Sequence, residues 1–319
     1  MIKILANDGI SQSGIDALDI KGFEVITKHV KQDELIKTIN SIGYEVLLVR
    51  SATTVRKDLI EACPNLKIIG RGGVGMDNID VEYAKEKGIT VINTPASSSS
   101  SVAELVFAHL FGMVRFLFDS NRQMPLIGDA DFKSLKKSYA NGTELTGKTL
   151  GIIGFGRIGK EVAKRAIGLG MNVIANDKFV KEANITLDFF NGEKKSFTIE
   201  TQNLKSLLNN SDFVTLHVPK IGNKAVIGAE EIGMMKTGAG ILNVSRGGVI
   251  DETALMFALD KQKLAYAGLD VFDNEPNPSI HICMHNAISL TPHIGAATIE
   301  AQQRIGTELA DQISSYFGK

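Results

Sequence analysis

Short apolar runs alternate with amphipathic stretches along the whole chain. The runs are rich in Ile, Val and Leu and are three to five residues long, and helix-like periodicity separates them. This alternation predicts parallel sheets covered by helices. We predict strands at residues 3–6, 24–27, 45–49, 67–69, 90–92, 149–153, 172–175, 213–216, 240–244, 265–269 and 288–290. We expect these eleven strands to form two separate sheets.

A proline- and serine-rich run, Asn93 to Glu104, interrupts the alternation after the fifth predicted strand. Within it, Ser101 and Glu104 have the spacing of a capping box for the long amphipathic helix that follows. We interpret the run as a hinge and cap between two domains rather than as a disordered segment. The chain is expected to cross back near Thr291, so that segment 298–317 returns to the first domain as its last helix. The predicted domains are 1–99 with 294–319, and 100–293.

A different pattern occupies residues 185–200. Asn191 and Gly192 stand between apolar residues, which predicts a β-hairpin inside an otherwise α/β chain. No function follows from this hairpin alone.

Composition excludes several classes of protein. The 319 residues include 35 basic and 36 acidic side chains, so the net charge of −1 provides no field to hold nucleic acid or an anionic membrane. No apolar run reaches the length of a membrane span, and residues 1–7 read as a strand rather than as a secretory signal. Two cysteines are too few for a disulfide framework. We therefore expect a cytoplasmic protein.

Three spaced glycines follow the apolar run at 149–153. Gly154 allows a tight turn, Gly156 lets the backbone approach a pyrophosphate, and Gly159 lets the next helix pack closely on its strand. The free N–H groups at the start of that helix then face the phosphates. The pattern predicts a dinucleotide site that includes Phe155, Arg157 and Ile158.

The next predicted strand ends in an acid, which selects between the two nicotinamide cofactors. Asp177 lies 177 − 154 = 23 positions after the first glycine, close to the expected spacing of roughly 20. A carboxylate there accepts ribose hydroxyl groups and repels a 2′-phosphate. The sequence therefore predicts NAD rather than NADP.

Polar residues follow most of the other predicted strands. Ligands of open α/β sheets bind beyond the carboxyl ends of the strands. The residues found there in the second domain are Asp177, His217 with Pro219, Ser245 with Arg246, Asp270 and His293. Those in the first domain are Asn7, Asp8, Arg50, Ser51, Arg71, Gly72, Gly73, Val74 and Asn93. Two such sets predict one cleft between two domains.

An ordered set of motifs resembles one family over nearly the whole chain. The motifs are Gly70-Arg-Gly-Gly-Val-Gly-Met-Asp-Asn78, Ile92-Asn-Thr-Pro95, Gly154-Phe-Gly-Arg-Ile-Gly159, Asn243-Val-Ser-Arg-Gly-Gly248, Asp273-Asn-Glu-Pro276 and Thr291-Pro-His-Ile-Gly295. They resemble those of the NAD-dependent D-2-hydroxyacid dehydrogenases, and within the family those of the D-3-phosphoglycerate dehydrogenases. The resemblance implies two Rossmann-like domains with a cleft between them, and a homodimer.

The resemblance also implies a catalytic set of Arg246, Glu275 and His293. Hydride transfer at C2 of a hydroxy acid requires an acid/base beside the same oxygen, and a histidine changes charge near neutral pH. We assign this role to His293, with Glu275 stabilising the imidazolium. Arg246 has a planar fork that suits the substrate carboxylate. The cofactor set includes His217, Val218, Pro219, Val244, Ser245, Asp270 and Gly295.

By the same resemblance, the substrate is a phosphorylated 2-hydroxy acid, oxidised at the entry to serine biosynthesis. The amides of Gly72, Gly73 and Val74 are expected to hold its carboxylate. The phosphate would be held by Arg50, Ser51, Arg71, Asn93 and, from a neighbouring subunit, Lys136 or Lys137; the choice between the two lysines stays open. Because the chain stops after the returning helix, we expect no serine-binding regulatory domain.

The sequence also allows three other interpretations. Another D-2-hydroxyacid dehydrogenase, such as a glyoxylate or hydroxypyruvate reductase, is the nearest. An NAD-sensing corepressor scaffold shares the fold, but Arg50 and Arg71 favour a small acid as ligand. His281, Cys283 and His285 alternate in a way that suggests a metal site, yet they lack a fourth ligand at suitable spacing, so no metal is predicted.

Overall fold

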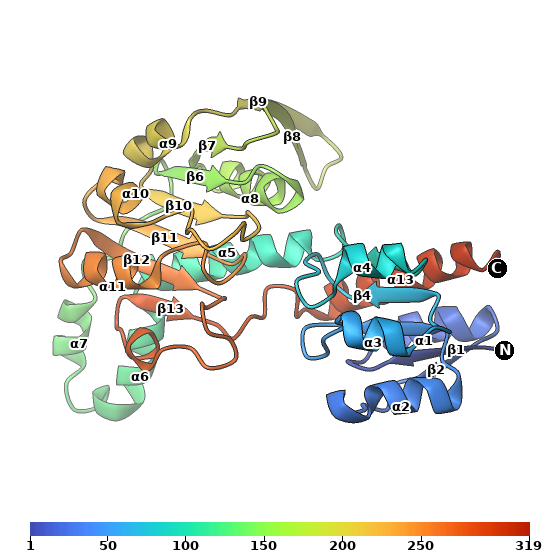
Figure 1. Cartoon of the computed structure of the whole chain (residues 1–319). Helices are drawn as coiled ribbons and strands as arrows, with labels where there is room; N and C mark the ends of the chain where they lie inside the picture. Colours follow the sequence, from blue (N-terminus) through green and yellow to red (C-terminus); the bar gives the residue numbers. More distant parts are fainter. The chain divides into compact units, whose positions relative to one another are not determined.

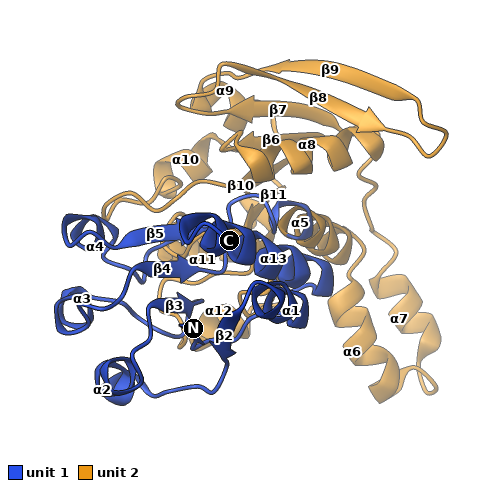
Figure 2. Ribbon diagram, turned by 90° about the vertical axis from the view of Figure 1, so that its right-hand side faces the viewer, with its two compact units in different colours: residues 1–101, 296–319 blue, residues 102–295 orange.

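The structure, a computed structural model, describes residues 1–319 and divides into two compact units (Figures 1 and 2). Unit 1 comprises residues 1–101 and 296–319, and unit 2 comprises residues 102–295. The two crossings lie two residues beyond the expected boundaries at 99 and 293. Each of the eleven predicted strands is present, with ends within two residues of the expected ones.

Unit 1 is built on a parallel five-stranded sheet in the order β2-β1-β3-β4-β5. Its strands are β1 (Ile2–Ala6), β2 (Phe23–Ile26), β3 (Val46–Val49), β4 (Ile68–Arg71) and β5 (Thr90–Asn93). Its helices are α1 (Gln12–Ile20), α2 (Gln32–Ile42), α3 (Lys57–Ala62), α4 (Val81–Glu86) and α13 (Ile299–Tyr316).

Helices cover both faces of this sheet. Alternate strand residues face opposite sides, so Leu5 joins a core with α2, α3 and α4, whereas Ile4 joins a core with α1 and α13. Helix α13 contributes Ile305, Leu309 and Ile313, which are four residues apart and so share one face. The last helix of the chain is therefore part of the first unit's core.

Unit 2 contains a parallel six-stranded sheet in the order β13-β12-β11-β10-β6-β7. Its strands are β6 (Thr149–Ile153), β7 (Asn172–Asn176), β10 (Phe213–Leu216), β11 (Ala239–Asn243), β12 (Leu264–Leu269) and β13 (Ile288–Leu290). The helices are α5 (Ser99–Val114, whose first turn precedes the boundary), α6 (Leu117–Ile127), α7 (Phe132–Ser138), α8 (Arg157–Gly168), α9 (Leu204–Asn210), α10 (Ala229–Met234), α11 (Glu252–Asp260) and α12 (Ile280–Cys283). Helices α5 and α8 pack on one face, and α9 to α12 pack on the other.

The predicted hairpin is present as β8 (Glu182–Asp188) and β9 (Lys194–Glu200), which pair antiparallel. Gly192 has a φ of 87°, as a tight hairpin turn requires. Ala183 and Ile185 of β8 are buried in the core that includes α8, whereas Phe190 at the turn is fully exposed. The hairpin therefore packs against the second unit along one face only.

The predicted capping box is wrong. Helix α5 begins at Ser99, so Ser101 lies in its first turn and does not cap it. The Ser101 hydroxyl instead lies 2.7 Å from that of Thr298, and Glu104 pairs with Arg165 of α8 at 2.9 Å. The two side chains bind distant segments, which the local spacing does not encode.

Helix α5 ends where the backbone bends. Phe116 adopts the left-handed conformation, with a φ of 53°, and α6 continues at 54° to α5. No single helix is long and apolar enough to cross a membrane, and the α5–α6 pair passes that test only when the two bent helices are taken together.

Candidate active site

The loops that follow the strands of unit 2 carry the predicted cofactor and catalytic residues. All six strands run parallel, so their carboxyl ends meet at one edge of the sheet. The glycine turn follows β6, Asp177 follows β7 and the His217 loop follows β10. Arg246, Glu275 and His293 follow β11, β12 and β13.

The first and third glycines are required by close approach. Gly154 has a φ of 93°, and a Cβ atom there would overlap the carbonyl oxygen of His217. A Cβ atom on Gly159 would overlap the carbonyl oxygen of Gly154, so the first turn of α8 lies directly against the strand end. Both positions therefore need glycine for packing within the protein.

Gly156 differs from the other two glycines. A Cβ atom on it would meet no atom within 4 Å, and its φ of −76° is open to any residue. It is the N-cap of α8 and no side chain caps the helix, so the first N–H groups of α8 have no acceptor within the helix. Open space beside free N–H donors fits the pyrophosphate of a dinucleotide.

Asp177 is held at the end of β7 by three backbone N–H groups. Phe155 donates to Oδ2 at 2.7 Å, and Phe179 and Val180 donate to Oδ1 at 2.7 and 3.0 Å. Burial alone would raise the pKa of Asp177, but these hydrogen bonds outweigh it and lower that pKa. The group is therefore ionised at neutral pH and lies beside the glycine turn.

The loop after β10 packs against the glycine turn. Val218 and the carbonyl of His217 border Gly154, while Pro219 is exposed. Desolvation lowers the pKa of His217 to about 3, and its Nδ1 atom is buried without a hydrogen-bond partner. His217 is therefore neutral, and its role toward a cofactor stays a prediction.

His293 and Glu275 form a direct pair. Nδ1 of His293 lies 2.8 Å from Oε2 of Glu275, and Oε1 of Glu275 accepts a hydrogen bond from Phe272 N–H at 2.9 Å. A carboxylate only accepts hydrogen bonds, so His293 donates from Nδ1 and leaves Nε2 for another partner. Both side chains remain partly exposed, at 40% and 35%.

Asp270 anchors the loop that carries His293. It is 1% exposed, and its carboxylate accepts from Ile294 N–H at 2.7 Å, Gly295 N–H at 2.9 Å and the Thr291 hydroxyl at 2.6 Å. These donors bracket His293, whose φ of 55° is unfavourable for a residue with a side chain. In this structure Asp270 binds the loop, and its predicted cofactor contact stays a prediction.

The Arg246 loop is held by Asn243, which sequence reasoning missed. Its side chain accepts from the N–H and hydroxyl of Ser245 and donates to the carbonyl of Arg246 at 2.8 Å. A Cβ atom on Gly247 would overlap the carbonyl oxygen of Phe272. The loops of Arg246 and Glu275 are therefore adjacent, and the three loops of the predicted catalytic set form one contiguous surface.

The predicted substrate residues lie at strand ends of unit 1. Arg50 follows β3 and Arg71 ends the neighbouring β4, where Val49 is paired with Arg71. The Arg71 side chain crosses directly over Gly73, which leaves no room there for a side chain. Asn93 donates to the carbonyl of Val74 at 2.7 Å and so holds the glycine loop itself. Ser51 is exposed beside Arg50.

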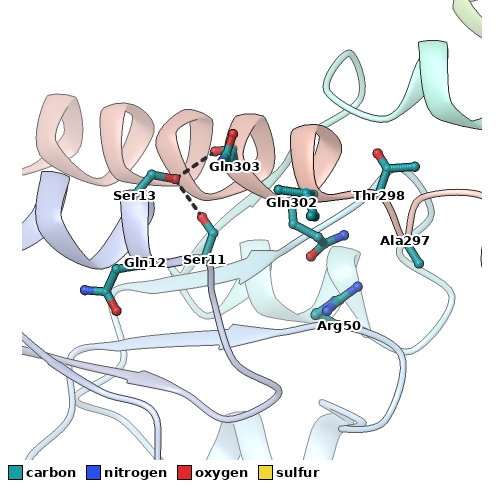
Figure 3. Close-up of a pocket in the computed structure, with 9 residues that line it drawn as sticks. Ser11, Gln12, Ser13, Arg50, Ala297, Thr298, Gln302 and Gln303 are labelled. Atoms are coloured by element: carbon teal, nitrogen blue, oxygen red, sulfur yellow. Dashed lines mark hydrogen bonds between the residues drawn. The ribbon is translucent and has the colours of Figure 1, made fainter.

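Arg50 lines a pocket of about 420 Å³ within unit 1. Its backbone is bonded to Asp8 and Asn78, but its guanidinium has no partner in the structure. The other lining residues come from the first turn of α1 and the start of α13 (Figure 3): Ser11, Gln12, Ser13, Ala297, Thr298, Ile299, Gln302 and Gln303. A cation in a pocket bordered by two helix N-termini suits an anionic ligand.

Two further predictions concern positions outside this site. Lys136 and Lys137 lie in the last turn of α7 and are exposed, and their predicted reach into a neighbouring subunit stays a prediction. No group of three or more His, Cys, Asp or Glu side chains is arranged to hold a metal ion.

Comparisons with known proteins identify the family. The family model for the NAD binding domain of D-isomer specific 2-hydroxyacid dehydrogenases matches residues 107–295. A hydroxypyruvate reductase from Thermotoga maritima is 42% identical over 99% of this chain and 98% of its own. A D-3-phosphoglycerate dehydrogenase from Methanocaldococcus jannaschii is also 42% identical over 98% of this chain, which spans only 57% of that relative's length.

The fold agrees with a solved structure. The TT0316 protein of Thermus thermophilus superposes with a TM-score of 0.86 at 29% identity, over 100% of this chain and 98% of that one. The family model matches more than half of the chain, and the hydroxypyruvate reductase matches over nearly the full length of both proteins. The chain therefore belongs to the D-isomer specific 2-hydroxyacid dehydrogenases, a family of NAD-dependent oxidoreductases.

Proposed function

We propose that this enzyme is a D-3-phosphoglycerate dehydrogenase, which interconverts 3-phosphoglycerate and 3-phosphohydroxypyruvate with NAD. The observation that carries the proposal is the unpaired guanidinium of Arg50 in its pocket, one strand away from Arg71. A 2-hydroxy acid without a phosphate needs one cationic fork for its carboxylate, which we assign to Arg246. Two further arginines at neighbouring strand ends suit a second anionic group.

The chain's own residues account for the proton that accompanies oxidation. A bound NAD would supply the hydride chemistry at C2 of the hydroxy acid, which leaves the proton on the C2 oxygen to the residues of this chain. His293 takes the hydroxyl proton on Nε2 during oxidation and returns it during reduction, since Nδ1 is committed to Glu275. Glu275 balances the charge of the imidazolium that forms. Arg246, whose Nη1 donates to the Ser245 carbonyl at 2.7 Å, carries the guanidinium that we assign to the substrate carboxylate.

The proposal also covers the cofactor contacts and the assembly. The N–H groups of Gly156, Arg157 and Ile158 would bind the pyrophosphate, and Asp177 the adenosine ribose. The enzyme would be a homodimer that acts in the cytoplasm in serine biosynthesis. Mass measurement by light scattering in solution tests the dimer directly.

A hydroxypyruvate reductase is the second candidate. The Thermotoga maritima relative of that name matches this chain over nearly the full length of both proteins. The two activities use the same catalytic residues and differ in the phosphate alone. Arg50 therefore distinguishes them.

The experiment measures kcat/KM with NADH for 3-phosphohydroxypyruvate, hydroxypyruvate and glyoxylate. We expect the phosphorylated substrate to be preferred, and Arg50→Ala to lower its kcat/KM about 10- to 100-fold while hydroxypyruvate changes little. Arg56→Ala is the matched control, because Arg56 forms a surface pair with Asp80 in the same unit. Equal efficiency with and without the phosphate, or an equal loss for both in Arg50→Ala, would favour the hydroxypyruvate reductase.

A further inference from the structure

A buried histidine lies behind the candidate catalytic loop. His109 of α5 is 2% exposed, yet both ring nitrogens have polar partners. Nδ1 lies 2.8 Å from the Ser289 hydroxyl, and Nε2 lies 3.0 Å from the Thr291 hydroxyl. Most positions of α5 that face this core are apolar, so a polar ring here costs free energy unless both nitrogens are bonded.

The direction of each hydrogen bond follows from the donors available. The Asp270 carboxylate only accepts, so the Thr291 hydroxyl gives its single proton to Asp270 at 2.6 Å. Thr291 must then accept from His109, which fixes the proton of the neutral ring on Nε2 and leaves Nδ1 to accept from Ser289. Burial lowers the pKa of His109 and outweighs the charge of Asp270, which acts to raise that pKa. The ring is therefore neutral near pH 7.

The chain of bonds ends on the backbone around His293. Asp270 holds the N–H groups of Ile294 and Gly295, which directly follow His293. The left-handed conformation of His293 persists only if its surroundings hold it. The Thr291 hydroxyl, once fixed by His109, keeps one oxygen of Asp270 aimed at the Ile294 amide.

We propose that His109 is a positioning residue, which acts through Thr291 and Asp270 to hold the backbone of His293 in its left-handed conformation. The predicted effect of His109 on catalysis rests on the proposed acid/base role of His293. The predicted effect of His109 on the backbone of the loop does not depend on that role. Sequence motifs give no sign of this role, because His109 is 182 residues from Thr291.

The test compares three substitutions of His109. Leu removes both polar groups, Asn is too short to reach Thr291, and Gln can place a donor near the position of Nε2 and an acceptor near that of Nδ1. Ser211→Ala is the control for lost buried polarity, because Ser211 is fully buried in unit 2 and donates to the Leu207 carbonyl in α9.

The first measurement is amide hydrogen exchange at Ile294 and Gly295 in the protein without cofactor. We expect exchange at these two amides to be about 5-fold faster in His109→Leu and His109→Asn, the factor expected for one typical hydrogen bond. Other protected amides of unit 2 should keep their rates, and His109→Gln and Ser211→Ala should match the wild type at both amides. Uniform acceleration across unit 2, or no difference between Asn and Gln, would overturn the proposal.

The second measurement compares kcat for the reduction of 3-phosphohydroxypyruvate with the Kd for NADH in each variant. His109→Leu and His109→Asn should lower kcat about 10-fold with the Kd unchanged, because a misplaced acid/base slows chemistry without affecting cofactor binding. In a Thr291→Val background, His109→Leu should have no further effect on kcat, since the connection is already broken. Additive losses would overturn the serial connection. Faster exchange at the two amides with a wild type that does not turn over 3-phosphohydroxypyruvate would overturn the proposed function alone, whereas unaltered exchange with an active wild type would overturn this inference alone.

Discussion

Nδ1 of His293 lies 2.8 Å from Oε2 of Glu275. The other oxygen of Glu275 accepts from Phe272 N–H, so the carboxylate binds two donors with its two oxygens. The pair fixes the tautomer of a neutral His293 with its proton on Nδ1. Nε2 is therefore the nitrogen that can exchange a proton with a substrate.

Glu275→Gln should damage the site although it is nearly isosteric. Glutamine has one acceptor oxygen, so either Phe272 N–H or His293 Nδ1–H must face an NH₂ group. We expect kcat to fall about 10²- to 10⁴-fold, as when the tautomer of a catalytic histidine is lost. Glu252→Gln is the control, because Glu252 accepts only from Asp273 N–H and an amide oxygen can keep that bond. Steady-state kinetics that show equal losses in the two variants would contradict the proposed pairing.

The three-glycine turn separates folding from cofactor binding. Gly156→Ala should keep the wild-type Tm but raise the Kd for NADH at least about 10-fold, since the added methyl fills space that no protein atom occupies. Gly154→Ala should lower Tm, because a Cβ atom there overlaps His217 and the φ of 93° strains alanine. Gly168→Ala in the same helix, where a Cβ atom meets nothing, is the control. Tight NADH binding by Gly156→Ala would show that the pyrophosphate lies elsewhere.

Asp177 should set the preference for NAD. The wild type should use NADH over NADPH by a factor of about 100 or more in kcat/KM, because an ionised carboxylate repels a 2′-phosphate. Asp177→Ala should weaken the binding of NADH and reduce the ratio of kcat/KM for NADH to that for NADPH. Efficient use of NADPH by the wild type would refute the prediction.

Stability should fall as the pH is lowered from about 7 to 5. The pKa of His217 is lowered to about 3 and that of His109 is also lowered, both mainly by burial, against about 6.5 in an unfolded chain. Below pH 6.5 these two histidines bind protons in the unfolded state but not in the native state, so the free energy of unfolding decreases with falling pH. Above pH 6.5 both histidines are neutral in both states, and the effect vanishes.

Urea unfolding of the cofactor-free protein between pH 5 and 7 measures this effect. His217→Gln should have a shallower dependence on pH than the wild type, by about one proton. His281→Gln is the control for the replacement of an exposed histidine. A wild-type slope in His217→Gln would mean that this histidine titrates alike in both states.

The strands and the glycine turn were predictable because their signals are local. Each strand coincides with one short apolar run, and the roles expected of Gly154 and Gly159 depend on neighbours within a few residues or on the adjacent strand. Parallel strands also place all their carboxyl ends at one edge. The sequence alone therefore predicts that the loops of Arg246, Glu275 and His293 lie at the same edge of the sheet.

The supporting residues were not predictable in the same way. Glu104 has the spacing of a capping residue but pairs with Arg165, 61 positions away. His109 reads as one more position of an amphipathic helix, and only packing brings it to Ser289 and Thr291. Asn243 stands in a motif, but its bonds to Ser245 and Arg246 depend on how the turn closes.

The most direct test of the account is the rate of NADH oxidation by His293→Ala, measured beside its Kd for NADH. The imidazole is proposed to exchange the substrate proton, and its side-chain partner is Glu275. We therefore predict a kcat about 10²- to 10⁴-fold below wild type with an unchanged Kd. A variant that turned over 3-phosphohydroxypyruvate at the wild-type rate would contradict the assignment of His293 and, with it, the proposed catalytic set.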